Sequence, residues 1–122
     1  MADDLQSWFE NLPDKVQAEL GDTMKTIAEG LADDIRSAAE LHSLSGETVN
    51  SVRVTPGRNA TENFVEAGGP LTTKNGYDHA LAEEFGTQKM AAMPFFYNIY
   101  HERQDDIRQA IDDAVSDAIS KA

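Results

Sequence analysis

The sequence predicts an α+β domain in which a long N-terminal helix and a C-terminal helix pack on a small antiparallel β-sheet. Apolar residues recur at helical spacing over residues 13–41 and again over 94–121, which indicates two amphipathic helices. Between them, part of 48–76 alternates with period two, as half-buried strands do. A chain of 122 residues is one domain by length. We therefore expect 1–122 to form one domain with one core, its helical stripes covering one sheet face.

Residues 13–41 are predicted to form one straight helix. Pro13 suits a first helical turn, where its missing N–H is no loss. Steps of four and three then average about 3.67 residues per turn, which gives a helix on the order of 40 Å long. Gly21 and Gly30 lie inside it, so we expect a bend or a close helix contact near one of them. The apolar stripe consists of Val16, Leu20, Met24, Ile27, Leu31, Ile35 and Ala38.

The N-terminal segment, residues 1–12, carries apolar residues at helical spacing, among them Trp8 and Phe9. A short amphipathic segment of this kind either folds back on its own domain or contacts a neighbouring molecule. Both uses are compatible with the sequence.

Residues 48–76 are predicted to be a β-hairpin region with a Gly-rich loop. The first strand begins at Thr48 and ends at the turn residues Pro56 and Gly57. The second covers 61–67 and alternates polar with apolar residues, so one face of the hairpin is expected to be wet.

The Gly-rich run 68–76 is predicted to be either a mobile loop or the tip of a second hairpin, because Asn75 and Gly76 are a strong turn signal. The segment 79–84 contains helix-forming residues but is too short for the pattern to decide between helix and strand.

The last part of the chain is predicted to be a turn and loop over 79–93 followed by a helix over 94–121. Pro94 is a natural helix start. The expected apolar stripe consists of Ile99, Tyr100, Ile107, Ile111, Val115 and Ile119, with aspartates mostly opposite.

Composition excludes several classes of function. The net charge is −12, which argues against general nucleic-acid binding because such binding depends on Lys and Arg at phosphates. The chain has no cysteine, so disulfides, thiolate metal sites and cysteine nucleophiles are excluded. No stretch approaches the roughly 18 apolar residues that span a bilayer, and the acidic N-terminus does not read as a secretory signal. We expect synthesis in the cytosol and no contact with a membrane.

Candidate catalytic chemistry is sparse. Paired carboxylates recur along the predicted helices, but adjacent helical residues point about 100° apart, so a solvated acidic face is the better interpretation. His79 and Glu83 would share one helix face, and His101 and Glu102 are the obvious further ligands for a metal. The HExxH, P-loop, GxSxG and GxGxxG motifs are absent. We therefore expect no catalytic residue, no metal site and no cofactor.

The most informative stretch is the run HALAEEFGTQKMAAMPFF from His79 to Phe96. It resembles the head-tail joining, or neck and tail-completion, proteins of long-tailed, lambdoid-type double-stranded DNA bacteriophages. Their signature is Tyr-Ala, then Glu-Phe-Gly-Thr, then Pro-Phe before a C-terminal helix. The matching residues are His79, Ala80, Glu84, Phe85, Gly86, Thr87, Pro94 and Phe95, with His79 in the place of the tyrosine.

A second family element is a Thr-Gly followed by a Ser and an aliphatic residue after the first helix. Here it reads Ser45 and Gly46, then Ser51 and Val52. Independently of the family, Phe85 is interpretable as a core residue, Gly86 as the residue of a tight turn and Thr87 as a cap.

The resemblance implies a non-enzymatic structural protein that forms a ring at the head-tail junction or the upper end of the tail. Its implied partners are other copies of itself, connector or head-completion proteins, and tail-tube or tail-terminator proteins. DNA would be only a passing cargo, and an acidic wall would repel it. The implied location is the virion neck or tail, after synthesis in the host cytoplasm.

Subunit contacts are expected where exposed loops and adaptable side chains coincide. The candidates are Trp8, Phe9, Gly68, Gly69, Lys74, Lys89, Met90 and Met93. Two rival functions are an acidic interaction module that inhibits a basic enzyme by mimicking DNA charge, and a small metal-dependent hydrolase built on the His and carboxylate residues named above.

Overall fold

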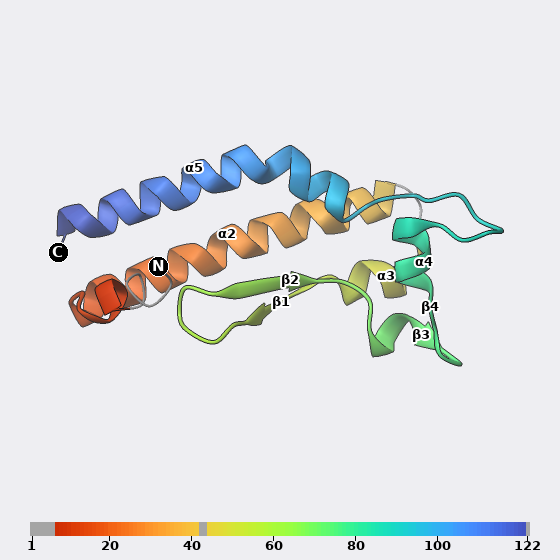
Figure 1. Cartoon of the computed structure of the whole chain (residues 1–122), viewed down its shortest axis with the longest axis horizontal. Coiled ribbons are helices and arrows are strands. Elements are labelled where there is room, and N and C mark those ends of the chain that lie inside the picture. The colour runs from red at the N-terminus through yellow and green to blue at the C-terminus, as the bar shows by residue number, and fades with distance from the viewer. Residues whose placement is uncertain (1–6, 42–43, 122) are drawn as a thin grey trace.

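The computed structural model describes residues 7–41 and 44–121, so the first six residues of the predicted N-terminal segment lie outside it. The predicted α+β class is confirmed. Helices α2 (Asp14–Leu41) and α5 (Tyr97–Lys121) lie side by side, and the hairpin of β1 and β2 packs beneath α2 (Figure 1). The shorter elements gather at one end of the long axis; these are α3 (Gly46–Ser51), β3 (Thr73–Lys74), β4 (Tyr77–Asp78) and α4 (His79–Phe85).

Helix α2 has 28 residues and forms the spine of the molecule. Its predicted stripe lies inward, where Val16, Leu20 and Ile35 are buried. The close contact expected near Gly21 involves a turn rather than a helix, since a Cβ there would lie 3.4 Å from the Ala60 carbonyl oxygen. A Cβ at Gly30 would meet nothing within 4 Å.

Helix α5 packs on α2 through small residues. Ala114 and Ala118 pack in the cluster that contains Val16 and Leu20, and Ala118 is the one buried residue of α5. The predicted stripe of larger residues is therefore wrong in part, because Ile111 and Ile119 stay exposed. Ion pairs at 3.0 Å and 2.9 Å tie the two helices together, Arg103 to Asp34 and Lys121 to Glu19 respectively.

The first strand begins later than predicted. Residues Gly46–Ser51 form the short helix α3 in place of a strand starting at Thr48. The Ser45 hydroxyl accepts a hydrogen bond from the Thr48 N–H and so caps this helix. The Thr48 side chain is also fully buried, and these tertiary interactions outweigh its β propensity.

Strands β1 (Arg53–Pro56) and β2 (Asn63–Glu66) form a two-stranded antiparallel sheet with Val54 opposite Val65. These two valines pack against the core, whereas Phe64 is exposed. The expected hairpin with one wet side is confirmed.

The Gly-rich run forms ordered elements, and the second-hairpin alternative is confirmed. A 3-10 turn, η1 (Pro70–Thr72), leads into β3 (Thr73–Lys74), which pairs with β4 (Tyr77–Asp78). The turn between the strands places Asn75 at φ 55° and Gly76 at φ 79°. Two successive positive φ angles are what a type I′ hairpin turn requires.

The question left open at 79–84 is settled in favour of a helix, α4 (His79–Phe85). The C-terminal helix begins at Tyr97, three residues after the predicted start at Pro94.

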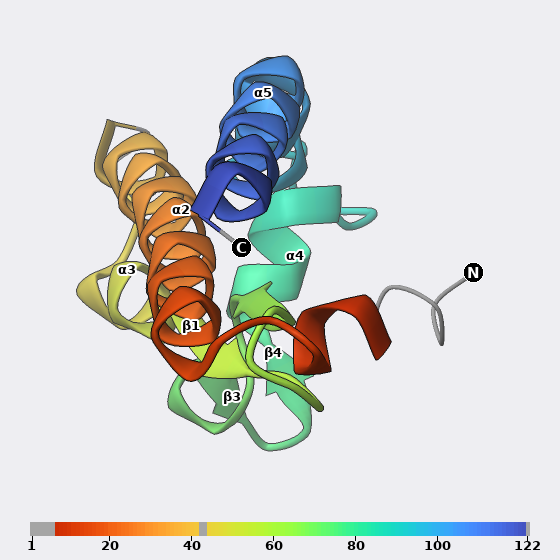
Figure 2. The ribbon, with the colours of Figure 1, turned by 90° about the vertical axis from the view of Figure 1, so that its left-hand side faces the viewer.

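Buried side chains form two clusters along α2 rather than the single core expected. One joins Ala32, Ile35 and Ala39 to Val52, Ala80 and Phe95. The other joins Phe9, Leu12, Val16 and Leu20 to Ala118. The N-terminal segment is helical at residues 7–10 and lies next to the N-terminal end of α2 (Figure 2). It supplies Phe9 to the second cluster.

Candidate functional site

The histidine and carboxylate residues of the hydrolase alternative do not converge. His79 Nε2 lies 3.2 Å from the Ser45 hydroxyl and 3.9 Å from a Glu47 oxygen. Glu83 accepts a hydrogen bond from the Thr48 hydroxyl at 3.2 Å. His101 is exposed on α5, with its ring centroid 5.5 Å from that of Tyr100. Within residues 7–41 and 44–121, no group of three or more His, Asp or Glu side chains is arranged to hold a metal.

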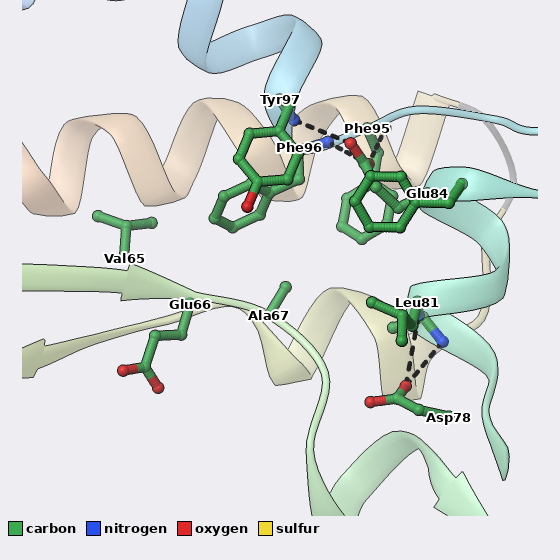
Figure 3. Close-up of a pocket in the computed structure, with 11 residues that line it drawn as sticks. Val65, Glu66, Ala67, Asp78, Leu81, Glu84, Phe95, Phe96 and Tyr97 are labelled. Atoms are coloured by element: carbon green, nitrogen blue, oxygen red, sulfur yellow. Dashed lines mark hydrogen bonds between the residues drawn. The ribbon is translucent and has the colours of Figure 1, made fainter.

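Glu84 is the most constrained residue of the Glu-Phe-Gly-Thr motif. Its Oε1 accepts hydrogen bonds from the N–H groups of Phe95 and Phe96, both at 2.9 Å, and its Oε2 accepts one from Tyr97 at 3.1 Å (Figure 3). The residue is only 7% exposed. Because α5 begins at Tyr97, one side chain from α4 satisfies N–H groups at the start of α5 and places a negative charge near its positive end.

This arrangement corrects the predicted role of the motif. The sequence predicts that Pro94 starts the last helix. Instead Pro94 precedes the helix, and the Glu84 carboxylate fixes where the helix starts. Local spacing gave no signal for this contact, because the partners are 11 to 13 residues away.

Gly86 is required at its position. Its φ is 78°, and a Cβ would lie 2.8 Å from the Ala92 nitrogen and 3.0 Å from the Met90 oxygen. The next residue, Thr87, pairs with Met90 through two backbone hydrogen bonds of 2.8 Å and 3.3 Å. Its hydroxyl accepts a bond from the Lys89 N–H at 3.2 Å. The predicted tight turn at Gly86 and cap at Thr87 are confirmed.

Asp78, which sequence reasoning did not single out, organises the start of α4. Its Oδ1 accepts from the Ala80 N–H at 3.0 Å and from the Thr72 hydroxyl at 2.6 Å, while Oδ2 accepts from the Gly69 N–H at 3.0 Å. Burial raises the pKa of this carboxyl, but the hydrogen bonds from Gly69, Thr72 and the helix N-terminus outweigh it and hold the pKa below its ordinary value. An Asp directly before a helix-forming run is the signal that could have identified this cap.

The second family element is also internal. Ser45 caps α3, and the buried Ser51 hydroxyl donates to the Thr48 carbonyl at 2.7 Å and accepts from the Gly68 N–H at 2.9 Å. A Cβ at Gly46 would meet nothing within 4 Å, so packing does not require glycine there. Gly68 is buried in this joint and is not available to a partner.

The outer side of α4 carries exposed apolar side chains. We define the α4 face as Tyr77, Leu81, Phe85 and Tyr97, whose exposed fractions are 54%, 60%, 62% and 48%. Phe85 is therefore not the core residue that the sequence suggested. Its ring lies 6.0 Å from that of Tyr97. Beside them, a cavity of about 270 Å³ lies between β2, α4 and the start of α5, with Leu81, Phe96 and Tyr97 among its lining residues (Figure 3).

The predicted contact residues divide into two groups. Lys74 is exposed on β3, and Lys89, Met90 and Met93 are exposed in the turn and loop that follow α4. Phe9 is 6% exposed, and Trp8 packs against the second core cluster, to which Phe9 belongs. The N-terminal segment therefore folds back on its own domain, which is the first of the two predicted alternatives. Gly69 is partly exposed and donates its N–H to Asp78.

No protein-family model, no curated protein and no solved structure matches this chain. Among the helices of the described residues, none combines the length and apolar character needed to cross a bilayer.

Proposed function

We propose that the protein is a non-enzymatic structural component of a bacteriophage or prophage neck, which assembles as a ring at the head-tail junction or the upper tail end. The proposal rests on the resemblance of the run from His79 to Phe96 to head-tail joining proteins. The observation that carries it is the contact of Glu84 with the start of α5. This contact makes the motif an architectural joint and presents a firmly held apolar surface beside it.

The distribution of polar groups supports an architectural role. In the two motif elements, Ser45, Ser51, Glu84 and Thr87 form hydrogen bonds within the chain, and Ala80 and Phe95 are buried. By contrast, the α4 face exposes large apolar groups to solvent, which is typical of a surface that meets another protein. The net charge of −12 suits a conduit through which DNA passes without adhering.

The test is assembly. Electron microscopy of the concentrated protein, alone and mixed with the products of the genes beside its own, is expected to show closed rings. The protein is also expected to leave duplex DNA unretarded in a gel. A protein that stays monomeric with these partners, or that instead forms a 1:1 complex with a basic enzyme and blocks its DNA binding, would contradict the proposal; the second result would favour the inhibitor alternative.

A further inference from the structure

Two lysines, Lys74 and Lys89, lie beside the uncharged α4 face of this acidic chain. Lys74 lies directly across the β3–β4 pair from Tyr77, so the two side chains share one side of that hairpin. Lys89 lies in the turn that follows Thr87, and Thr87 borders a shallow hollow of about 380 Å³ shared with Tyr77 and Phe85. Figure 1 shows both turns at the same end of the molecule, next to α4.

These two lysines form no ion pair with a described residue, whereas five other cations of the chain do. Arg36, Arg53, Arg58, Arg103 and Lys121 each pair with a carboxylate of the chain. Neither Lys74 nor Lys89 forms an ion pair with any residue in 7–41 or 44–121. The nearby carboxylates of Asp78 and Glu84 are taken up by backbone N–H groups. An apolar surface flanked by two ammonium groups fits a partner that is both apolar and acidic.

Helix α5 offers such a surface. Asp105, Asp112 and Ile119 are spaced by seven residues, which places them on one side of the helix, and we call them the α5 outer face. All three are exposed, and neither aspartate makes an ion pair with a described residue; the exposed Arg108 lies between the aspartates on the same side of the helix. Ile111, one turn before Val115 and two before Ile119, adds a further exposed apolar group on the flank of this face.

Asp112 and Ile119 of the α5 outer face cannot meet the α4 face of the same molecule, whereas Asp105 lies about two turns from Tyr97. The α4 face lies at one end of the long axis, and the C-terminal half of α5 lies at the other (Figure 1). A contact between different patches of identical chains is heterologous, and repeated contacts of this kind close into a ring or continue as an open chain.

We propose that the α4 face of one copy binds the α5 outer face of a second copy, with Lys74 and Lys89 meeting Asp105 and Asp112, and with Leu81 and Phe85 covering Ile119. This inference rests on the proposed ring and names the surfaces that build it.

The first experiment is zero-length carbodiimide cross-linking of a mixture of ¹⁵N-labelled and unlabelled full-length protein, at high concentration and in the assembled neck. Mass spectrometry is expected to find mixed-isotope links from Lys74 or Lys89 to Asp105 or Asp112. Intermolecular links that involve only other residue pairs would overturn the proposed contact.

The second experiment reverses the charges. We expect the double variant K74E/K89E, and separately D105K/D112K, to weaken self-association in sedimentation velocity at least about tenfold. The quadruple variant restores association, because the pairs are then reversed on both sides. The matched control K15E/K25E makes the same charge change at two exposed lysines of α2 and is expected to associate like the wild type.

The third experiment tests the head-to-tail geometry. Leu81→Asp disrupts binding by the α4 face, and Ile119→Asp disrupts binding by the α5 outer face. Both positions are exposed, so we expect the fold to tolerate a charge there. Each variant alone is expected to be monomeric, and their mixture to give a 1:1 dimer and nothing larger, because each has only one intact face. Rings that form normally in all these variants would overturn the contact and leave the proposed function standing. A wild type that is monomeric with and without the neighbouring neck proteins overturns both.

Discussion

The Glu84 carboxylate is a buried charge whose partners are three backbone N–H groups at the start of a helix. Hydrogen bonds to a charged group are stronger than those between neutral groups, and a buried donor that loses its partner is costly. The neighbouring carboxylate on α4, Glu83, is held less tightly, because its buried Oε2 has no hydrogen-bond partner among the described residues. Two adjacent residues of the same type therefore contribute very differently to stability.

We expect Glu84→Gln to lower the free energy of unfolding by about 1–3 kcal/mol. Glutamine has an NH2 group in place of one carboxylate oxygen, so a donor would face a backbone N–H group where the wild type has an acceptor. Urea denaturation followed by circular dichroism measures this change. Glu83→Gln is the matched control, with an expected change below about 1 kcal/mol. Equal losses in the two variants would contradict the proposed role of Glu84.

Asp78 makes the stability depend on acid pH. The folded pKa lies below the unfolded value of about 3.8, so the stabilisation is complete above that value and is lost as the pH falls through the folded pKa. Asp78→Asn, which cannot ionise, is therefore expected to be less stable than the wild type at pH 7. The difference between their urea midpoints should shrink below about pH 4. A difference that stays constant from pH 7 to pH 3 would exclude this ionisation as the cause.

The sequence predicts well those helices, strands and turns that depend on apolar periodicity or on turn residues. Helix α2 and the β1–β2 hairpin follow from apolar spacing, and the β3–β4 turn follows from Asn75 and Gly76. The strand predicted from Thr48 is wrong because a serine cap and burial favour α3. The predicted start of α5 is wrong because the Glu84 side chain, on α4, determines where the helix begins. Neither cause is visible in a local window.

Two glycines with opposite surroundings test the packing of these elements. Gly30→Ala lies in the middle of α2 with open space around it, so we expect a gain of up to about 1 kcal/mol from helix propensity. Gly86→Ala has to adopt a positive φ and meets the Ala92 backbone, so we expect a loss of at least about 1 kcal/mol. Thermal and urea unfolding of the pair measure both. A stabilising Gly86→Ala would mean that the turn is not held as described.

The whole molecule is a pair of long helices with a small sheet beneath and an apolar, lysine-flanked surface at one end. Composition alone predicts an acidic protein that avoids DNA, but it cannot show that two of the ten Lys and Arg residues stand unpaired beside the exposed aromatic groups of the α4 face. That juxtaposition arises because the β3–β4 hairpin and the turn at residues 87–90 lie at the same end of the fold.

Self-association through the α4 face is expected to weaken with salt. Raising the ionic strength from about 0.05 M to about 0.5 M shortens the Debye length to roughly 4 Å, which screens lysine–aspartate contacts at an interface rim. Sedimentation equilibrium should show a severalfold increase in Kd for the wild type. The neutral variant K74Q/K89Q should associate more weakly at low salt and lose most of the salt dependence. A wild type whose salt dependence equals that of K74Q/K89Q would contradict the proposed lysine–aspartate contacts.

The turn at residues 87–90 is anchored on both sides. The Gly86 N–H donates to the Ala82 carbonyl at 2.7 Å, and the Met93 N–H donates to the Glu83 carbonyl at 2.7 Å. Helix α4 therefore binds the chain on both sides of this turn, and its residue Glu84 also binds the start of α5. The distance between the two ends is thus independent of the length of chain that joins them. A peptide inserted between Gln88 and Lys89 would therefore leave the cap of α5 in place while covering the contact proposed for the α4 face, so this insertion separates a loss of assembly from a loss of folding.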